Sequence, residues 1–224
     1  MESREIILDR LRSLRKVSGS RERPSYTPES IFADIPHSER APLLEQFSKK
    51  LTALRGEVFS VASYDQAAAK IAELASASDL LRCGRQRVPL LDRLFGSHQG
   101  LASLEREMTI VDAGEPLSHE AVESMQCAFT VADALIVRTG SIVLRSTTAG
   151  GRRLSVLPPI HCVVATADQL VPCLSSWLGQ VHEDSLWSYG TIITGPSRTA
   201  DIERILVLGA HGPKRLIVII IDEH

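Results

Sequence analysis

The chain has 224 residues, of which 44% are hydrophobic and 23% charged, and its formal net charge is −2. These proportions are ordinary for a globular protein with one large domain or two small ones, which can bury a core without disulfides or metals. The balanced charge argues against nucleic-acid binding, no apolar run reaches membrane-spanning length, and no apolar signal region opens the chain, so we expect a cytoplasmic protein.

The N-terminal quarter reads as helix, connector and helix. Residues 2–17 repeat apolar side chains at helical spacing, and residues 42–55 resume that period. Between them, residues 18–40 carry three prolines among serines and charges, a composition typical of an extended connector. We therefore expect an N-terminal helical arm and linker over residues 1–55, whose apolar faces are covered by a partner subunit or by the chain's own body.

From residue 56 onward, strand-like and helix-like segments alternate. Strands are expected at 58–61, 80–83, 109–111, 134–137, 141–144, 154–157, 160–165, 191–194 and 216–221. Helices are expected at 65–74, 89–95, 118–128 and 168–178. Residues 216–221 are apolar on both faces, which is typical of an interior strand covered by helices. The pattern predicts an α/β domain over residues 56–224, with a layered mixed sheet flanked by helices.

The cysteines show no metal-binding spacing. Cys83, Cys127, Cys162 and Cys173 form no C-x-x-C pair, so the sequence predicts neither an iron–sulfur nor a zinc site in this chain. The sequence also lacks the phosphate-binding loop, the dinucleotide fingerprint, the nucleophile elbow and the zinc-protease helix. Hydrolase, nucleoside-triphosphatase and zinc-protease activities therefore have little support.

Two glycine-containing runs are candidates for anion binding. Thr139, Gly140 and Ser141 fit a hairpin turn, and they equally fit a turn whose N–H groups and hydroxyls face a small anion. The other run, residues 150–153, consists of two glycines followed by two arginines and ends at Arg153. It fits a solvated loop, or a clamp in which arginine bonds a carboxylate.

His161 lies in an apolar strand just after two prolines. A lone histidine in such a strand is more often a hydrogen-bonded core residue than a catalytic one. The two prolines raise the chance of a functional role, because they would place His161 at a strand end beside a pocket.

The C-terminal run from Gly195 to Glu203 is the most polar segment in an apolar region. It predicts a turn that opens a helix near residue 200, capped by Ser197 or Thr199, with Arg198 as an added cation. The expected first helical turn contains two carboxylates, Asp201 and Glu203. They could accept hydrogen bonds from ligand hydroxyls or act as acid and base.

A second glycine-rich run follows at residues 209–213 and contains His211 and Gly212. A histidine between glycines packs poorly in a regular element, so His211 joins Glu203 as a candidate for proton transfer.

These runs resemble the LUD domain of the lactate-utilisation proteins. The resemblance rests on residues 139–144, 151–153 and 157–161, and on the closing signature over 193–203 and 209–213. In its length and in its lack of ferredoxin-type cysteines, the chain is similar to the small members that contain this domain alone.

The resemblance implies an α/β fold related to the sugar-phosphate isomerase and CoA-transferase class. It also implies a role in oxidising L-lactate to pyruvate together with an iron–sulfur LUD protein and a cysteine-rich partner subunit. The iron–sulfur clusters then belong to the partners, and we expect no cofactor and no metal on this chain. No catalytic mechanism carries over residue by residue.

The leading hypothesis is a ligand-binding or accessory subunit of a cytoplasmic lactate-oxidising complex, non-catalytic alone. The alternatives are a stand-alone binder or enzyme for a small carboxylate, sugar phosphate or acyl-CoA, and a scaffold without ligand. We expect the candidate ligand-binding residues to converge on a small anion at the ends of neighbouring strands. They are Thr139, Gly140, Ser141, Arg153, His161, Gly195, Ser197, Arg198, Thr199, Asp201 and Gly212.

Overall fold

The computed structural model describes residues 40–112, 117–145, 153–180, 189–200, 206–208 and 212–223, together with Asp9. The chain divides into two units, residues 1–33 and 34–224, and nearly all described residues belong to the second. Apart from Asp9, the expected helix over 2–17 lies outside the described residues, and so does most of the connector. None of the helices in the described ranges is long and apolar enough to cross a membrane.

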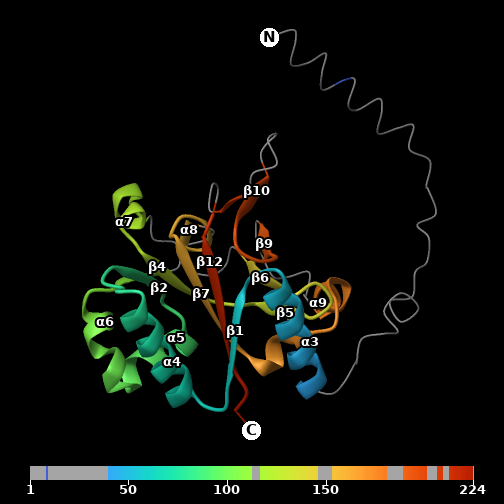
Figure 1. Cartoon of the computed structure of the whole chain (residues 1–224), viewed down its shortest axis with the longest axis horizontal. Helices are drawn as coiled ribbons and strands as arrows, with labels where there is room; N and C mark the ends of the chain where they lie inside the picture. Colours follow the sequence, from blue (N-terminus) through green and yellow to red (C-terminus); the bar gives the residue numbers. More distant parts are fainter. Residues whose placement is uncertain are drawn as a thin grey trace, which may run out of the picture. The chain divides into compact units, whose positions relative to one another are not determined.

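A six-stranded parallel sheet forms the centre of the second unit (Figure 1). Its strands follow the order β1-β12-β7-β4-β2-β3. Their bounds are β1 Glu57–Val61, β2 Cys83–Gln86, β3 Thr109–Val111, β4 Cys127–Val131, β7 Ile160–Thr166 and β12 Arg215–Ile221. Leu216 to Ile221 are all buried, and β12 pairs on both sides, so the expected interior strand is confirmed.

A smaller four-stranded sheet has the order β8-β5-β6-β9. Its bounds are β5 Ala134–Ile136, β6 Ser141–Arg145, β8 Leu170–Val171 and β9 Gly190–Ile193. Strands β5 and β6 form the expected antiparallel hairpin, in which Gly140 has a φ of 64°. A further antiparallel pair consists of β10 Arg198–Ala200 and β11 Leu206–Leu208.

Helices cover both sheets. Their bounds are α3 Arg40–Ala53, α4 Tyr64–Ala77, α5 Pro89–Ser97, α6 Ala102–Arg106, α7 His119–Glu123, α8 Arg153–Val156 and α9 Leu174–Gln180, with short 3-10 turns η1 Gln99–Leu101 and η2 Ala167–Gln169. Helix α4 begins as expected, because the Ser63 hydroxyl accepts a hydrogen bond from the Gln66 N–H. The expected domain boundary at residue 56 stays a prediction.

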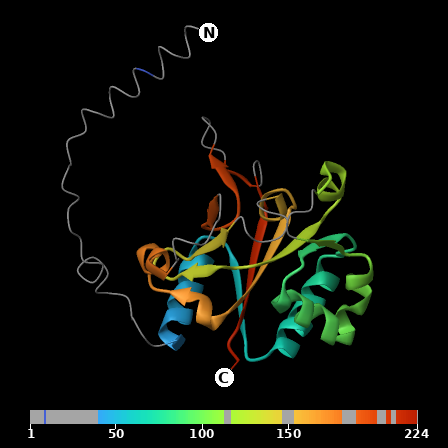
Figure 2. The ribbon, with the colours of Figure 1, turned by 180° about the vertical axis from the view of Figure 1, so that it is seen from behind.

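The core lies on both faces of the main sheet. Helices α4, α5 and α6 pack on the face that carries Cys162, Val164 and Ile219. Helix α3 lies beside β1, on the side of the small sheet, as Figure 1 and Figure 2 show from opposite directions. Trp177 of α9 packs on the face of the small sheet that carries Ile136 and Val143. The expected layered α/β architecture is therefore confirmed.

Several element boundaries differ from expectation because polar or ambiguous residues occupy the strands. Strand β2 begins at Cys83, where the expected strand ends, and contains Arg85 and Gln86. Arg85 is tolerated in the core because it bonds Asp92 at 2.5 Å and Glu105 at 3.1 Å. The Gln86 side chain accepts a hydrogen bond from the Val131 N–H at 2.9 Å.

Three expected elements are wrong in type or extent. The expected helix over 118–128 ends at Glu123, and its last residues open strand β4. The expected strand over 154–157 is helix α8, whose short apolar run does not distinguish the two states. The expected helix over 168–178 is divided into η2, β8 and α9, because Pro172 falls within it.

Candidate functional site

Two glycines of the sequence motifs lie against the C-terminal end of α3. Gly140 and Gly195 have positive φ angles of 64° and 96°. A Cβ atom added to Gly140 would lie 2.7 Å from the Leu51 backbone nitrogen, and one added to Gly195 would lie 3.1 Å from the Leu54 carbonyl oxygen. Both positions therefore require glycine for their conformation and for the close approach of α3.

Hydroxyl groups connect the two turns. The Ser141 hydroxyl donates to Thr139 Oγ1 at 2.7 Å and lies 2.8 Å from Thr194 Oγ1. Ser141 is buried, and Thr194 is exposed. Since Ser141 donates to Thr139, Thr194 donates to Ser141. Sequence analysis missed Thr194, although its position directly before Gly195 in the motif could have drawn attention to it.

Arg198 contacts the same end of α3. One of its terminal guanidinium nitrogens donates to the Leu54 carbonyl oxygen at 2.9 Å. Arginine side chains near a helix C-terminus satisfy carbonyl groups that have no partner within the helix. The structure therefore gives Arg198 a contact that supports the fold. Its guanidinium is exposed and has further N–H donors.

The turn from Gly195 is followed by a strand in the described residues, and not by the expected helix, which corrects the expectation. It leads into strand β10, and the Ser197 N–H donates to the Pro213 carbonyl at 2.9 Å. Within the described residues, positions 198–200 form a strand where the capped helix was expected. The Ser197 N–H is therefore engaged by the chain itself. Sequence analysis missed strand β10 because serine and threonine, as at positions 197 and 199, are common both at helix N-caps and at the start of strands.

Gly212 and Pro213 join this turn to the main sheet. A Cβ atom added to Gly212 would lie 3.1 Å from Ser197 Cβ. The neighbouring Lys214 N–H donates to the Pro159 carbonyl at 2.8 Å, just before β7 and β12 begin. The motif segments thus meet at the amino ends of these strands, whereas ligands of open α/β sheets commonly bind at the carboxyl ends.

His161 is a buried core residue with one hydrogen-bond partner. Its Nε2 atom lies 2.7 Å from Thr130 Oγ1, and its Nδ1 atom has no partner in the part of the chain that the structure describes. Complete burial lowers the pKa of His161 to about 3, so the ring is neutral at physiological pH. Sequence analysis left two interpretations of His161 open, a hydrogen-bonded core residue or a residue beside a pocket. The structure shows the first.

The remaining candidates do not join this cluster in the described residues. Arg153 is exposed at the start of α8, and its guanidinium donates to the Leu117 carbonyl at 2.5 Å. Asp201, Glu203 and His211 lie outside the described residues, so their proton-transfer roles stay predictions. The Thr199 backbone belongs to β10, and its side chain is not described.

A buried ion pair supports the hairpin that carries Ser141. Asp133 accepts hydrogen bonds at 2.7 Å from both the backbone N–H and the side-chain Nε of Arg145. The Asp133 carboxylate is 8% exposed. These contacts hold the C-terminal end of β6, the strand that begins at Ser141.

The four cysteines are free thiols and all are buried. Among the residues that the structure describes, no group of three or more His, Cys, Asp or Glu side chains is placed to hold a metal ion. The expectation that this chain carries no cluster stays a prediction.

Comparison with solved structures shows the same fold in a DUF162 family protein from Deinococcus radiodurans. The TM-score is 0.55 at 20% identity, and the match covers 82% of this chain and 99% of that one.

Sequence comparison shows more specific relatives. The chain is 29% identical over 224 residues to Lactate utilization protein C of Halalkalibacterium halodurans, with 97% of this chain and 95% of that protein covered. It is 33% identical over 142 residues to Lactate utilization protein C of Bacillus pumilus, covering 60% of this chain and 56% of the relative. The LUD domain family model matches residues 44–221. The chain therefore belongs to the LUD domain family.

Proposed function

We propose that this protein is a subunit of a cytoplasmic complex that oxidises L-lactate to pyruvate. The observation that carries the proposal is the similarity to a protein named Lactate utilization protein C over almost the whole of both chains. The motif segments that sequence analysis connected with the family form one connected group of contacts, from Thr139 through Gly195 to Pro213. A shared fold alone would not support a function this specific.

The described contacts favour an accessory or ligand-binding role over catalysis by this chain alone. The Ser197 N–H is bonded to Pro213, and the His161 ring is buried and neutral. Exposed groups at the end of α3 include Arg198, which retains N–H donors for a carboxylate. Such a group can orient an anion, and Glu203 and His211 stay the candidates for proton transfer.

The electrons require partner subunits. Oxidation of lactate to pyruvate releases two electrons and two protons, so a redox-active group must accept them. We propose that an iron–sulfur LUD protein and a cysteine-rich subunit supply the clusters. The burial of all four thiols of this chain supports that division of labour. Residues 1–33, which form a separate unit, are the segment proposed to help dock the partners.

Copurification tests the assembly. A tagged full-length protein and a variant lacking residues 1–33 are expressed in the native host grown on L-lactate. We expect the full-length protein to retain both partners and the truncated protein to lose them while keeping its cooperative thermal unfolding. Capture of neither partner by the full-length protein would contradict the proposal. Turnover of lactate or of a sugar phosphate by the isolated chain would favour the stand-alone alternative.

Arg198→Ala tests the anion site. A charge-assisted hydrogen bond contributes about 1.5–3 kcal/mol, so the variant should bind L-lactate or pyruvate roughly ten- to a hundredfold more weakly. Arg106→Ala, on an exposed helix face, is the matched control. Because Arg198 also contacts the end of α3, thermal unfolding of each variant must accompany the calorimetry. Unchanged affinity in a folded Arg198→Ala protein would exclude Arg198 from the site.

A further inference from the structure

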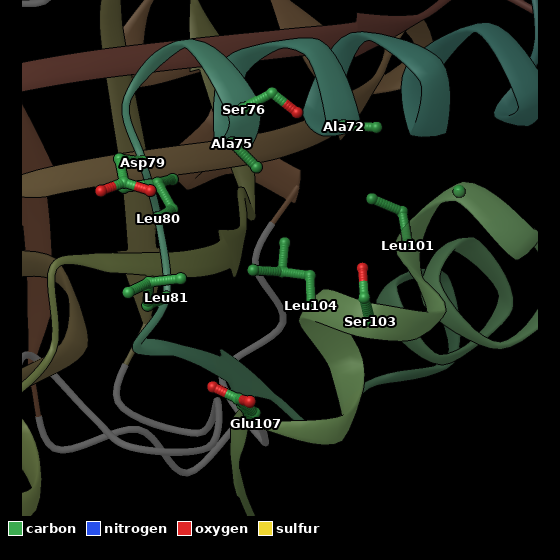
Figure 3. A pocket seen from close by; sticks show the side chains of 11 residues that line it. Ala72, Ala75, Ser76, Asp79, Leu80, Leu81, Leu101, Ser103, Leu104 and Glu107 are labelled. Carbon is green, nitrogen blue, oxygen red and sulfur yellow. The ribbon is translucent and has the colours of Figure 1, made fainter.

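A pocket of about 310 Å³ lies between α4 and the η1–α6 segment, apart from the candidate site described above (Figure 3). Figure 3 shows Ala75 on α4 and Leu104 on α6 pointing toward one another across it. The pocket is lined by Ala72, Ala75, Ser76, Asp79, Leu80, Leu81, Gly100, Leu101, Ser103, Leu104 and Glu107. Small-molecule sites begin at about this volume, with apolar walls and a few polar groups.

Small side chains on the facing elements create the hollow. Helix α4 contributes Ala72 and Ala75, and the opposite wall contributes Gly100 and Ser103. Leucine at any of these positions would occupy the space with several additional carbon atoms. The hollow therefore results from small residues at the contact between α4 and the η1–α6 segment. The packing beside it is tight, since Leu101 of η1 is fully buried.

The charged residues among the described lining of the pocket are all acidic. Asp79 and Glu107 are its two charged residues, both are exposed, and neither carboxylate forms an ion pair with another residue in the described ranges. None of the described residues that line it is a lysine or an arginine. Hydroxyl groups of Ser76 and Ser103 can donate or accept hydrogen bonds and carry no charge. An anion would be repelled here, so the pocket does not suit lactate, pyruvate or a phosphate.

We propose that this pocket binds a small organic cation, with an ammonium or guanidinium group at the end of a short aliphatic chain. The chain lies against Leu80, Leu101 and Leu104, and the cationic group lies at the exposed edge of the pocket, where Asp79 and Glu107 make the lining negative. The same chemistry is offered by a free alkylamine and by a lysine side chain of a partner protein. The proposal is independent of the lactate role, because none of the candidate lactate-site residues that the structure describes lines the pocket.

A titration followed by NMR of the full-length protein tests the proposal at low ionic strength. The probes are pentylammonium, its neutral counterpart 1-pentanol and the anion hexanoate. We expect pentylammonium to shift the amide signals of Ala75, Leu101 and Leu104, and to bind more tightly than pentanol, whereas hexanoate should not bind. Equal binding of pentanol and pentylammonium, or shifts confined to other residues, would overturn the proposal.

Two variants separate charge from shape. The double variant Asp79→Asn, Glu107→Gln should weaken pentylammonium about tenfold, since each exposed carboxylate contributes up to about a fivefold effect. Asparagine suits position 79 because the φ angle there is 48°. Ala75→Leu should abolish binding by filling the pocket. The control Glu73→Gln removes an exposed carboxylate of α4 that does not line the pocket. Equal loss in the control would overturn the proposal.

A last arm identifies the source of the cation. The free amine is compared with an acetylated five-residue peptide that carries one lysine between leucines. Tighter binding of the amine supports a free ligand, and tighter binding of the peptide assigns the cation to a partner chain. Failure of both probes would overturn the site, and it would leave the lactate proposal untouched.

Discussion

Replacing Gly140 with alanine tests whether the Thr-Gly-Ser motif is required by packing. Gly140 has a φ of 64°, which a residue with a side chain adopts at a cost of about 1–2 kcal/mol. The added Cβ would also lie 2.7 Å from the Leu51 nitrogen and 2.9 Å from Lys50 Cβ. The Leu51 nitrogen belongs to the backbone of α3, so the helix or the hairpin must move.

The expected loss follows from these two contributions. Overpacking of a well-packed region costs about 1–3 kcal/mol, and the conformational cost adds to it. We therefore expect Gly140→Ala to lower the free energy of unfolding by about 2–5 kcal/mol. Gly195→Ala should cost less, because its Cβ would meet its nearest neighbour, the Leu54 carbonyl oxygen, at 3.1 Å.

Urea unfolding followed by circular dichroism measures the effect. The matched control is Gly96→Ala in α5, where an added Cβ meets nothing within 4 Å and helix propensity favours alanine by up to about 1 kcal/mol. The reasoning is refuted if Gly140→Ala is as stable as Gly96→Ala. Packing against α3 would then not explain the glycine at position 140, and the close approach of a ligand would be the alternative explanation.

Two further predictions concern buried ionisable side chains. Because the folded pKa of His161 is about 3 and its unfolded pKa is near 6.5, stability is complete above about pH 6.5 and falls below it. The loss attributable to His161 is about 2 kcal/mol at pH 5, and urea unfolding at pH 8 and pH 5 should show it in the wild type but not in His161→Gln. An equal pH dependence in both proteins would contradict the assignment. Arg85→Met should cost less stability than the double variant Asp92→Asn, Glu105→Gln, which strands a buried guanidinium and costs about 3 kcal/mol. The reverse order in thermal unfolding would show that the Arg85 side chain, which is 4% exposed, needs no partner.

Periodicity predicted the elements that bury one face or both, and it failed where polar residues enter the sheet. Strand β12 was predictable because six consecutive apolar residues have few alternatives. Strand β2 was misplaced because Arg85 and Gln86 look exposed until their partners are known. Those partners lie on α5, α6 and β4, and a single sequence gives no information about such distant contacts.

The candidate site was predictable as a set of segments, but the contacts of its residues were not. The hairpin turn at Gly140 follows from local chemistry, since glycine tolerates positive φ. The approach of α3 to Gly140 and Gly195 depends on tertiary packing, and so does the bond from Arg198 to the Leu54 carbonyl. The sequence therefore suggested a ligand as the partner of Arg198, whereas the structure shows the C-terminal end of α3 as a partner.

Growth of the native host on L-lactate tests the central claim most directly. The gene is deleted, and the strain is complemented with the wild-type protein or with the double variant Arg198→Ala, His211→Ala. The account predicts that deletion abolishes growth on L-lactate but not on pyruvate, that the wild type restores it, and that the double variant does not. Undiminished growth of the deletion strain on L-lactate would contradict the proposed function.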